Sequence, residues 1–470
     1  MLRLLIGVMV LSYMSISIAL IILLITLSIL SVFAQEPYVN PPLWVDHDNI
    51  FDVAISSDGD IIVLSTYTQL KVYNRSGYLL WSWPTPSKYI GIQAVDVSDD
   101  GNYVVGVYFE LYNTYIVFWK NARSLSGTPD PDWMSENLGG SIWKNALAIS
   151  GDGNHVVAAG TGPNIFYWNN TLSLSGTNIP PTWSDTMDPW QAEYVDISRD
   201  GNVVVVAGER YYIDSGSINV YYYENAAFKS GSVDPDNSWL FKTNYYNSLG
   251  GLALSEDGRY LVVGTQNRTR FIDTVTGNIL WNSTICDCLM VDVDISNNGS
   301  TVIVATNYDF EPHNISIFHN AYSKSGSSVD PDITVDSIFH QYTINGFTDI
   351  SLDGTGTMAI AGTGDYVFAI DTITGDIIWY YPDSNGNISL VVEISENGLY
   401  AITGGSIESA CLFEVQVPPK PIGGNIAYAI PQIIQKVMII MLIITILVYM
   451  IFKKYRSCLL YTSPSPRDRG

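Results

Sequence analysis

Cysteine and basic side chains are scarce in this sequence. Four of the 470 residues are cysteine, and 22 are lysine or arginine against 46 aspartate or glutamate, which gives a formal net charge of −24. Contacts with phosphate require clustered lysine and arginine, so this balance argues against a nucleic-acid partner. Cations or basic partners suit the charge better.

Several catalytic signatures are also missing. The sequence contains no HExxH pair, no GxSxG elbow and no P-loop, and its five histidines show no paired ligand spacing. A catalytic zinc, a hydrolase of the nucleophile-elbow type and a phosphate-binding loop therefore lack support. We predict no catalytic residue, which favours a protein that is not an enzyme.

Two long apolar runs, one near each end, predict export and membrane anchoring. Residues 4–34 carry no charge and follow Arg3. We interpret 1–34 as a signal peptide or, because the run is unusually long, as an uncleaved signal anchor. Residues 432–452 are long enough to span a bilayer and precede the basic stub 453–457, which the positive-inside rule keeps in the cytoplasm. We expect a single-pass protein of the cell membrane, with the region between the two runs outside.

The region between the two runs divides into a folded part and a linker. We expect residues 35–417 to fold and 418–431, rich in proline and glycine, to hold the fold near the membrane as a short stiff spacer. The last residues, 458–470, resemble the in-frame translation of a sequencing adapter. We exclude them from the fold and expect the natural tail beyond Ser457 to differ.

The cysteines do not define a disulfide framework. With Cys458 set aside, Cys286, Cys288 and Cys411 remain, an odd number in a compartment that permits disulfides. A bridge between Cys286 and Cys288 would close a strained small ring. A bond from Cys411 to either sulfur is about as plausible as no bond, so the disulfide state stays open.

One phrase occurs eight times, as in VDISRDGNVVVVAG from Val195, where apolar residues flank an Asp-Gly pair. Asp-Gly and Asn-Gly favour a two-residue hairpin turn because both central positions need positive φ, so each phrase predicts a β-hairpin. The turn glycines recur every 41 to 57 residues, the period of propeller blades, and are Gly59, Gly101, Gly153, Gly201, Gly258, Gly299, Gly354 and Gly398.

Two further apolar runs follow each hairpin, and the second often ends at tryptophan, as in TGNILW from Thr276. Four strands per unit, eight units and no convincing amphipathic helix predict an all-β, eight-bladed β-propeller of four-stranded blades. A degenerate last unit would leave seven blades. That unit stops after its third run, ACLFEVQV from Ala410, whereas PLWVDHD from Pro42 matches the fourth runs. We therefore expect the Pro42 segment to complete the final blade and close the ring.

These repeats resemble the WD40 and quinoprotein-like propeller superfamily over residues 42–417. YLVVGTQNRTRFIDTVTGNILW and MAIAGTGDYVFAIDTITGDIIW are similar to PQQ-type repeats, although the Gly-His and Trp-Asp marks of ordinary WD40 blades are missing. The arrangement also resembles membrane-anchored propeller proteins of archaeal cell surfaces. The resemblance implies the fold, and the superfamily includes dehydrogenases, assembly factors, receptors and scaffolds.

One position in the hairpin phrase carries the candidate metal ligands. Two residues before the serine of each phrase lie Ala54, Asp96, Ala148, Asp196, Ala253, Asp294, Asp349 and Glu393. If the first strand of each blade is innermost, the five acids lie near the channel, where they could collect Ca²⁺. Alternatively, each could accept hydrogen bonds from backbone or serine groups at the hairpin, which we favour. Alanine at three places argues against a closed ring of ligands.

Two other features invite a functional interpretation. The loops SGTPDPDW from Ser126, SGSVDPDNSW from Ser230 and SGSSVDPDI from Ser325 carry aspartate pairs that could chelate Ca²⁺, but aspartate near proline favours turns. The quinoprotein resemblance implies PQQ and Ca²⁺ on the axis beneath two adjacent cysteines. ICDCL from Ile285 departs from that pattern by one residue, so we predict no bound cofactor.

Taken together, the residues predict a non-catalytic scaffold, exported and membrane-anchored, that binds a protein or glycan at the cell surface. A PQQ- and Ca²⁺-dependent quinoprotein oxidoreductase and a receptor for a small extracellular ligand are the alternatives. Seven sequons permit glycosylation of the exported chain, and they lie at Asn74, Asn169, Asn267, Asn282, Asn298, Asn314 and Asn387.

Overall fold

The computed structural model describes most of the region expected to fold. It covers residues 38–86, 91–142, 144–160, 164–187, 191–210, 216–242, 249–266, 268–284, 289–307, 314–335, 347–363, 366–382, 391–405 and 409–415. All of them lie in one compact unit, Met1–Val415. The segments 1–34 and 418–470 lie outside the described residues, so the predictions made for them stay predictions. Within the described part, no helix is long and apolar enough to cross a membrane.

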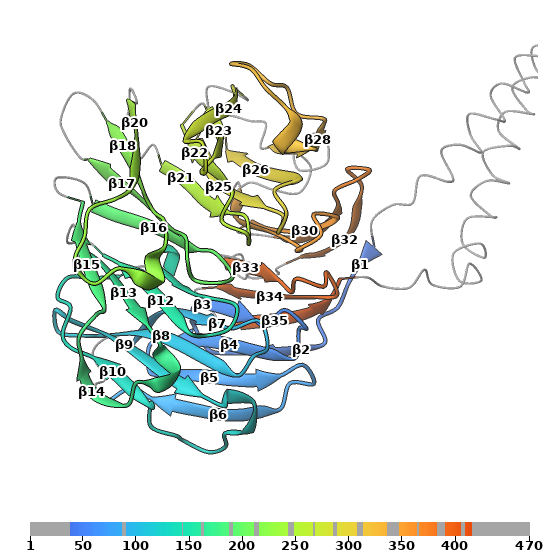
Figure 1. Cartoon of the computed structure of the whole chain (residues 1–470). Coiled ribbons are helices and arrows are strands. Elements are labelled where there is room, and N and C mark those ends of the chain that lie inside the picture. The colour runs from blue at the N-terminus through green and yellow to red at the C-terminus, as the bar shows by residue number, and fades with distance from the viewer. Residues whose placement is uncertain are drawn as a thin grey trace, which may run out of the picture. The chain divides into compact units, whose positions relative to one another are not determined.

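The described residues form eight sheets, which are the blades of a propeller (Figure 1). Five sheets have four strands. Blade 1 contains β3 (Ile50–Ile55), β4 (Ile61–Thr66), β5 (Gln69–Asn74) and β6 (Leu79–Pro84). Blade 4 contains β16 (Gln191–Ile197), β17 (Val204–Arg210), β18 (Ser217–Tyr223) and β20 (Asn237–Lys242). Blade 5 contains β21 (Leu249–Leu254), β22 (Tyr260–Thr265), β23 (Arg268–Asp273) and β24 (Asn278–Ser283). Blade 6 contains β25 (Leu289–Ile295), β26 (Thr301–Asn307), β27 (Asn314–His319) and β28 (Ile333–Val335). Blade 8 contains β33 (Val391–Ile394), β34 (Tyr400–Gly405), β35 (Ser409–Glu414) and β2 (Trp44–Asp46).

The other three sheets have a fifth strand, which lies parallel to the fourth at the outer edge. Blade 2 contains β7 (Ile92–Val97), β8 (Tyr103–Glu110), β9 (Asn113–Lys120), β10 (Trp133–Ser135) and β14 (Gly176–Ile179). Blade 3 contains β11 (Leu147–Ile149), β12 (His155–Ala159), β13 (Asn164–Asn169), β15 (Trp183–Thr186) and β19 (Gly231–Ser232). Blade 7 contains β29 (Phe347–Leu352), β30 (Met358–Thr363), β31 (Tyr366–Asp371), β32 (Ile377–Pro382) and β1 (Tyr38–Val39). Short 3-10 helices punctuate the connections: η1 (Ala122–Ser124), η2 (Lys144–Ala146), η3 (Thr171–Ser173), η4 (Ala226–Phe228) and η5 (Ala321–Ser323).

The first strand of each blade is innermost. Each contacts the first strands of both neighbouring blades, in the closed order β3, β7, β11, β16, β21, β25, β29, β33 and back to β3. This ring confirms eight blades, and the seven-bladed alternative is wrong. It also places the first strands around the axis, as the assignment of the acidic residues to the channel requires.

The chain closes the ring by joining its two ends in blade 8. The strand β2 pairs antiparallel with β35, with Trp44 opposite Leu412. The Leu43 N–H donates a 2.7 Å hydrogen bond to the Leu412 carbonyl. The prediction that the Pro42 segment completes the final blade is therefore confirmed.

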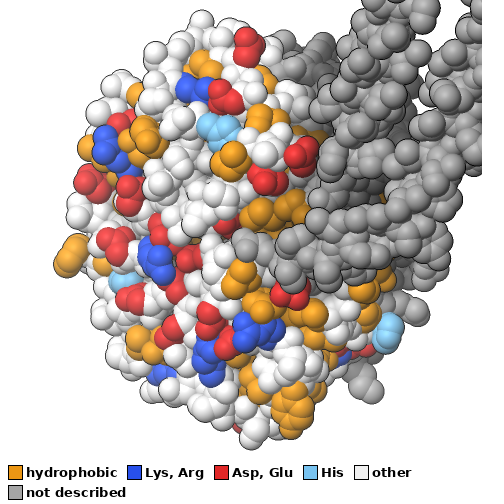
Figure 2. Space-filling model, turned by 90° about the vertical axis from the view of Figure 1, so that its right-hand side faces the viewer, with side chains coloured by type: hydrophobic (Ala, Val, Ile, Leu, Met, Phe, Trp, Pro, Cys, Tyr) orange, Lys and Arg blue, Asp and Glu red, His pale blue; other side chains and the backbone are white. Residues whose placement is uncertain are grey.

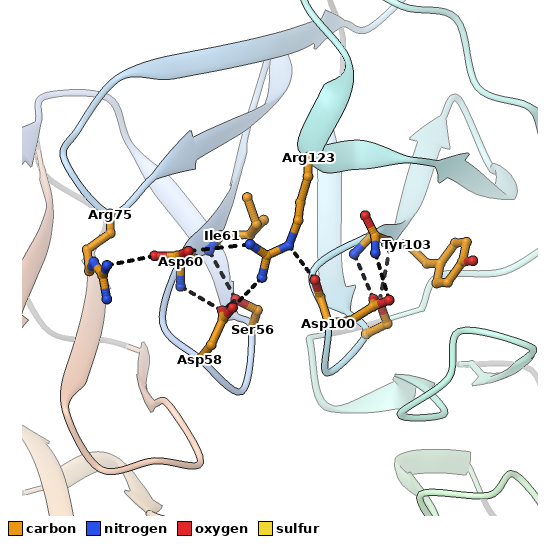
Figure 3. A network of polar contacts seen from close by, with 10 residues as sticks. Ser56, Asp58, Asp60, Ile61, Arg75, Asp100, Tyr103 and Arg123 are labelled. Carbon is orange, nitrogen blue, oxygen red and sulfur yellow. Dashed lines mark hydrogen bonds and ion pairs between the residues drawn. The ribbon is translucent and has the colours of Figure 1, made fainter.

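The hairpin turns differ from the expected two-residue type. In blade 1 the Gly59 N–H donates to the Ser56 carbonyl at 2.8 Å, and Gly59 has φ of 73° while Asp58 does not have positive φ. The Ser56 Oγ accepts from the Ile61 N–H at 3.0 Å and donates to the Asp58 carboxylate at 2.7 Å (Figure 3). A side-chain network therefore shapes the turn, and only its glycine needs the left-handed conformation.

Blade 7 shifts this turn by two residues relative to the expected alignment. There the Gly356 N–H donates to the Asp353 carbonyl at 2.8 Å, and Gly356 has φ of 74°. Asp353 thus replaces the serine of the phrase, and Gly356 is the turn glycine. Our assignment of that role to Gly354 was wrong, because DGTG offers two glycines and the sequence does not show which one turns.

The hydrophobic core lies between neighbouring blades. One cluster joins Val63 and Trp81 of blade 1 to Val95 and Trp119 of blade 2, all of them buried. Several fourth-strand tryptophans also donate an indole N–H to a backbone carbonyl of the next blade, as Trp81 does to Ala122 at 2.8 Å. The same bond links Trp183 to Ala226, Trp239 to Gly277, Trp281 to Ala321 and Trp44 to Arg75. Tryptophan at the end of the fourth run therefore serves packing between blades.

Candidate functional site

The strand order defines two faces of the propeller. Consecutive strands in a blade are antiparallel, so the first-to-second and third-to-fourth connections lie at one end, which we call the turn face. The second-to-third connections lie at the other end, which we call the loop face. Candidate site residues occur at the axis, at the turn face and at the loop face.

Four carboxylates occupy one level of the axis, in every second blade. We call the serine of each hairpin phrase, or Asp353 in blade 7, the turn residue. Two residues before it, blades 2, 4, 6 and 8 carry Asp96, Asp196, Asp294 and Glu393. The same position in the odd blades holds Ala54, Ala148, Ala253 and Ser351. Acidic and small side chains therefore alternate around the ring.

Each of these acids reaches the next blade. The Asp96 carboxylate accepts from the Ile149 N–H at 2.8 Å, and the Asp196 carboxylate accepts from the Leu254 N–H at 2.7 Å. In the same way Asp294 accepts from Leu352 at 2.7 Å and Glu393 accepts from Ile55 at 3.2 Å. The three aspartates also accept their own next N–H, as Asp196 does from Ile197 at 2.7 Å. Each acid thus clamps the first strands of two blades.

Asp349 belongs to a second level of the axis. Because Gly356 is the turn glycine of blade 7, Asp349 lies four residues before the turn residue, level with Asp52 and Asp292. These three also clamp the following blade: Asp52 accepts from Val95 at 2.9 Å, Asp292 from Ile350 at 3.4 Å and Asp349 from Val392 at 2.9 Å. Sequence reasoning missed Asp52 and Asp292, although Asp292 and Asp294 share one face of a strand by their spacing of two.

Burial makes the first-level acids hard to ionise. It raises the pKa of Asp96 and of Asp294 to about 7 and that of Asp196 to about 6. Burial also raises the pKa of Glu393 well above its ordinary value, and the charges of Asp96 and Asp52 add to the effect. Hydrogen bonds from backbone N–H groups oppose these shifts, since they favour the charged form.

The predicted Ca²⁺ site is divided between the two levels. Asp349 lies on the second level, and the other four predicted ligands lie on the first: Asp96, Asp196, Asp294 and Glu393. Within the described part of the chain, no group of three or more His, Cys, Asp or Glu side chains is placed to hold one metal ion. The loop aspartates also have backbone partners: Asp132 accepts from the Lys120 N–H and Asp332 from the His319 N–H, both at 2.7 Å. Backbone N–H groups thus donate to the axial acids and to these two loop aspartates, and Ca²⁺ binding stays a prediction for both sets.

The turn face carries a second ring around the axis, made by backbone groups. In blades 1 to 7, the residue after the turn residue donates its backbone N–H to the carbonyl of the equivalent residue in the next blade. Gly151 donates in this way to Arg199 at 2.9 Å, and Arg199 donates to Glu256 at 2.9 Å. The chain of bonds runs through Ser57, Asp99, Gly151, Arg199, Glu256, Asn297, Gly354 and Glu396, and the Asn397 N–H returns to the Ser57 carbonyl at 3.3 Å. This ring fixes the positions of the side chains at the channel mouth.

A single guanidinium joins three acids at that mouth. Arg199 contacts Asp99 at 2.5 Å, Glu256 at 2.9 Å and Glu396 at 3.8 Å. Burial, together with the hydrogen bond to Glu256 and its charge, raises the pKa of Glu396 to about 7. Figure 3 shows another guanidinium between blades 1 and 2, where Arg123 donates to the Asp58 carboxylate at 2.6 Å and to the Asp100 carbonyl. On the face shown in Figure 2, basic side chains likewise lie beside acidic ones.

The loop face presents an exposed apolar tip on blade 2. Leu111 and Tyr112 join β8 to β9 in a two-residue turn, between the paired residues Glu110 and Asn113. Both have positive φ, 44° and 76°, although neither is Gly, Asn or Asp. Their side chains are 56% and 86% exposed. Such a turn strongly prefers Asn-Gly, so this one keeps two large apolar side chains in water at a conformational cost.

A second exposed aromatic residue lies at the loop face of the neighbouring blade 1. Tyr67, between β4 and β5 of blade 1, is 52% exposed and packs against Phe51 with ring centroids 4.2 Å apart. Gly91 connects the two features: the Phe109 N–H donates to the Gly91 carbonyl at 3.2 Å, and a Cβ added to Gly91 would collide with the Tyr67 carbonyl. We call Phe51, Tyr67, Leu111 and Tyr112 the aromatic patch.

The remaining predicted residues lie apart from these sites. Cys411 is buried in β35, whereas Cys286 and Cys288 lie outside the described residues, so the disulfide state stays untested. Among the sequons, Asn298 is exposed at a hairpin turn, and Asn169 donates its Nδ2 to the Ala227 carbonyl at 2.6 Å. Asn267 and Asn387 also lie outside the described residues.

Comparison with known proteins identifies the fold. No protein-family model matches the chain, and no curated protein matches it. The crystal structure of the C-terminal WD40 domain of Sif2 matches it with a TM-score of 0.59 at 11% sequence identity, over 82% of this chain and 100% of that one. The chain has the fold of a WD40 propeller. The β-propeller domain of Cps50 (Swd1) from Myceliophteria thermophila has a TM-score of 0.48 at 11% identity, over 69% of this chain and 96% of that one. The WD40 part of the expected resemblance is confirmed for the fold, and the PQQ-type and archaeal parts stay predictions.

Proposed function

We propose that this protein is an exported, membrane-anchored β-propeller that acts as a non-catalytic scaffold and binds a protein partner through the aromatic patch. WD40 propellers generally bind protein partners, and the axial acids of this chain hold neighbouring blades together. The observation that carries the proposal is the tip formed by Leu111 and Tyr112, which are 56% and 86% exposed at positive φ. Backbone strain of this kind clusters at binding and switch regions.

The chemistry of the patch favours a protein over a glycan of high charge. Exposed tyrosine side chains give a large contact area at low cost in conformational entropy, as aromatic anchors do at protein interfaces. Phe51 and Tyr67 extend the area onto blade 1 with a T-shaped ring contact at an interplanar angle of 76°. The partner's docking surface should therefore be an apolar pocket with a polar rim.

Photo-crosslinking from the tip tests this function. A photoreactive phenylalanine in place of Tyr112 should give discrete protein adducts in the native cell. The matched control places the same residue at Val275, which is 75% exposed in the short third-to-fourth turn of blade 5, on the turn face. We expect no adduct from position 275. Equal adducts from both positions, or adducts from position 275 alone, would remove the patch from the proposal.

Glycosylation of the native protein tests export separately. Asn298 uses its Oδ1 to accept from the Ser300 N–H at 2.9 Å and is exposed, so a glycan on its Nδ2 would leave the turn intact. A glycan on Asn169 would instead displace the bond to Ala227. In a host that glycosylates exported proteins, Asn298→Gln should reduce a glycosidase-sensitive shift in gel mobility by one glycan, and Asn169→Gln should leave it unchanged. An unshifted wild-type protein would argue against export.

A further inference from the structure

The outer edges of five blades are covered by a segment in parallel register with the fourth strand. In blade 2 this segment is β14, in blade 3 β19 and in blade 7 β1, and blades 1 and 5 have single bridges. The paired residues are Trp81 with Gly127, Trp133 with Gly176, Trp183 with Gly231, Trp281 with Gly326, and Trp379 with Tyr38. Except for Tyr38, each covering residue is the glycine of a Ser-Gly-Thr or Ser-Gly-Ser sequence.

The covering segments use one hydrogen-bond pattern. The glycine donates to the carbonyl before the tryptophan, as Gly231 does to Thr182 at 3.0 Å. The N–H after the tryptophan donates to the glycine carbonyl, as Ser82 does to Gly127 at 3.0 Å. At Gly127, Gly176 and Gly231 an added Cβ would meet no atom within 4 Å, yet φ is positive at each. Glycine is therefore favoured at these positions because it adopts positive φ easily, and not because a larger side chain would lack space.

Blade 4 has the longest edge that no described residue covers. Its fourth strand, β20, has six residues, against three for β28 in blade 6 and three for β2 in blade 8. The next blade supplies no cover, because its third and fourth strands are joined by the short segment between Asp273 and Asn278. Figure 1 shows β20 at the rim of its sheet. A long edge strand with an exposed apolar residue, such as Leu240 at 54%, invites pairing with another chain.

The register of blade 4 identifies the groups that would pair. The Asp132 N–H donates to the Phe118 carbonyl in blade 2, and the Asp236 N–H donates to the Tyr222 carbonyl in blade 4, both at 2.8 Å. The two aspartates therefore occupy equivalent positions in their blades. The position of Trp133 is then held by Asn237 in blade 4. Ser238, next in the chain, is the counterpart of Ser82, whose N–H donates to a covering glycine.

The Ser238 N–H already has a substitute acceptor. It donates to the Oδ1 of Asn237 at 2.8 Å, where the covered blades offer a glycine carbonyl. From this stand-in bond and the five covered edges we infer that β20 is a peptide-binding edge. It takes a Ser/Thr-Gly-Ser/Thr segment of a partner protein in parallel register, with the glycine at positive φ opposite Asn237. This site lies on blade 4 and does not depend on the aromatic patch of blades 1 and 2.

Fluorescence anisotropy with the full-length protein tests the inference. The probe is a labelled synthetic peptide, LSGTNIPP, which copies residues 174–181 and so contains the covering strand β14. We expect saturable binding with a dissociation constant below about 1 mM, the range of weak binding. Replacing the peptide's glycine by L-alanine should weaken binding about tenfold, because L-residues resist the left-handed conformation. Replacing it by sarcosine, which lacks the N–H, should abolish binding and leaves the protein unchanged.

Two protein variants should act in opposite directions. Ser238→Pro removes the N–H that would donate to the peptide, and an edge strand tolerates proline, so binding should be lost. Asn237→Ala removes the competing acceptor and should tighten binding by about 2- to 10-fold, the value of one net hydrogen bond. Unfolding curves of both variants check their fold.

Three results would overturn the inference. They are no binding at about 1 mM peptide, equal binding of the sarcosine peptide, and equal binding by a folded Ser238→Pro variant. Self-association that Ser238→Pro abolishes, without peptide binding, would instead assign the edge to a second copy of the chain. None of these results bears on crosslinking at position 112, so the proposed function fails or stands separately.

Discussion

The carboxylate of Asp196 on β16 accepts a 2.7 Å hydrogen bond from the backbone N–H of Leu254 on β21. This bond ties blade 4 to blade 5 at the axis, and equivalent bonds tie blades 2 to 3, 6 to 7 and 8 to 1. A propeller must hold the narrow ends of its blades together. Acids in every second blade contribute to that connection, together with Asp52, Asp292 and Asp349 at the second level.

The clamp should make stability depend on pH in a defined direction. Burial raises the pKa of Asp196 from 3.8 to about 6, so between these values the folded state binds more protons than the unfolded state. The contribution of this group to the free energy of unfolding therefore falls as pH rises through that range. Urea unfolding of Asp196→Asn, measured at a series of pH values, should show a flatter dependence than the wild type. Asp234→Asn, which changes an exposed loop residue, is the matched control. Parallel curves for Asp196→Asn and wild type would contradict the assignment.

The seam that closes the ring should depend on Asp46. Its carboxylate, on β2, contacts the Lys71 ammonium at 2.6 Å and the Tyr73 hydroxyl at 2.5 Å, and both Asp46 and Lys71 are 8% exposed. Replacing Asp46 by alanine leaves Lys71 with only the half-exposed Asp48, at 2.7 Å, as its partner. The loss should therefore exceed that of a surface pair but stay below the about 3–5 kcal/mol of an unpaired buried charge. Urea unfolding should show that loss. Asp60→Ala, which removes surface pairs with Arg75 at 3.1 Å and with Arg123 at 3.4 Å, should cost less, about 1 kcal/mol at most.

The contribution of Asp46 to the free energy of unfolding should change with pH in the opposite direction to that of Asp196. Burial raises the pKa of Asp46, but bonds from Lys71, Tyr73 and the Asp48 N–H outweigh burial and hold the pKa below 3.8. Its contribution to stability is therefore complete above pH 3.8 and is lost as pH falls further. If Asp46→Ala and wild type lost stability equally on acidification below that value, the ion pair would not be the cause.

The turn formed by Leu111 and Tyr112 on blade 2 should lower the stability of the fold and support binding of the partner. Leu111→Asn with Tyr112→Gly installs the pair that the turn prefers, so it should raise the free energy of unfolding by about 1–2 kcal/mol. Urea unfolding measures the gain, and the double variant should no longer capture the partner found by crosslinking. A less stable double variant would mean that the two side chains pack against the fold. That result would remove the strain argument.

The sequence predicted the repeat, the blade number and the closure because each depends on local patterns. Asp-Gly between apolar runs locates a hairpin wherever it occurs, and the tryptophan of the Pro42 segment matches its counterparts in other blades. The error at Gly354 came from two glycines in one turn, a choice that depends on which residue replaces the serine. Contacts in the folded chain, and not the composition of the segment, determine that Gly356 is the turn glycine.

The covered edges could not be predicted from strand patterns. β14 and β19 have exposed or half-buried side chains, so they lack the apolar alternation that marks a strand. Their only signal was a glycine at a constant position after the third strand. The aromatic patch was missed for a similar reason, since Leu-Tyr is not a turn sequence and ELYNT reads as a continuous strand.

Ligand-dependent unfolding tests the central claim most directly, which is that the axial acids join blades and do not hold a cofactor. Thermal unfolding of the full-length protein would be measured with Ca²⁺ alone and with PQQ plus Ca²⁺. A ligand at 100 times its dissociation constant adds about 2.7 kcal/mol to the folded state. We predict no shift of the midpoint under either condition. A shift with Ca²⁺ alone would make the acids a metal site, and a shift only with PQQ would favour the oxidoreductase and contradict the scaffold.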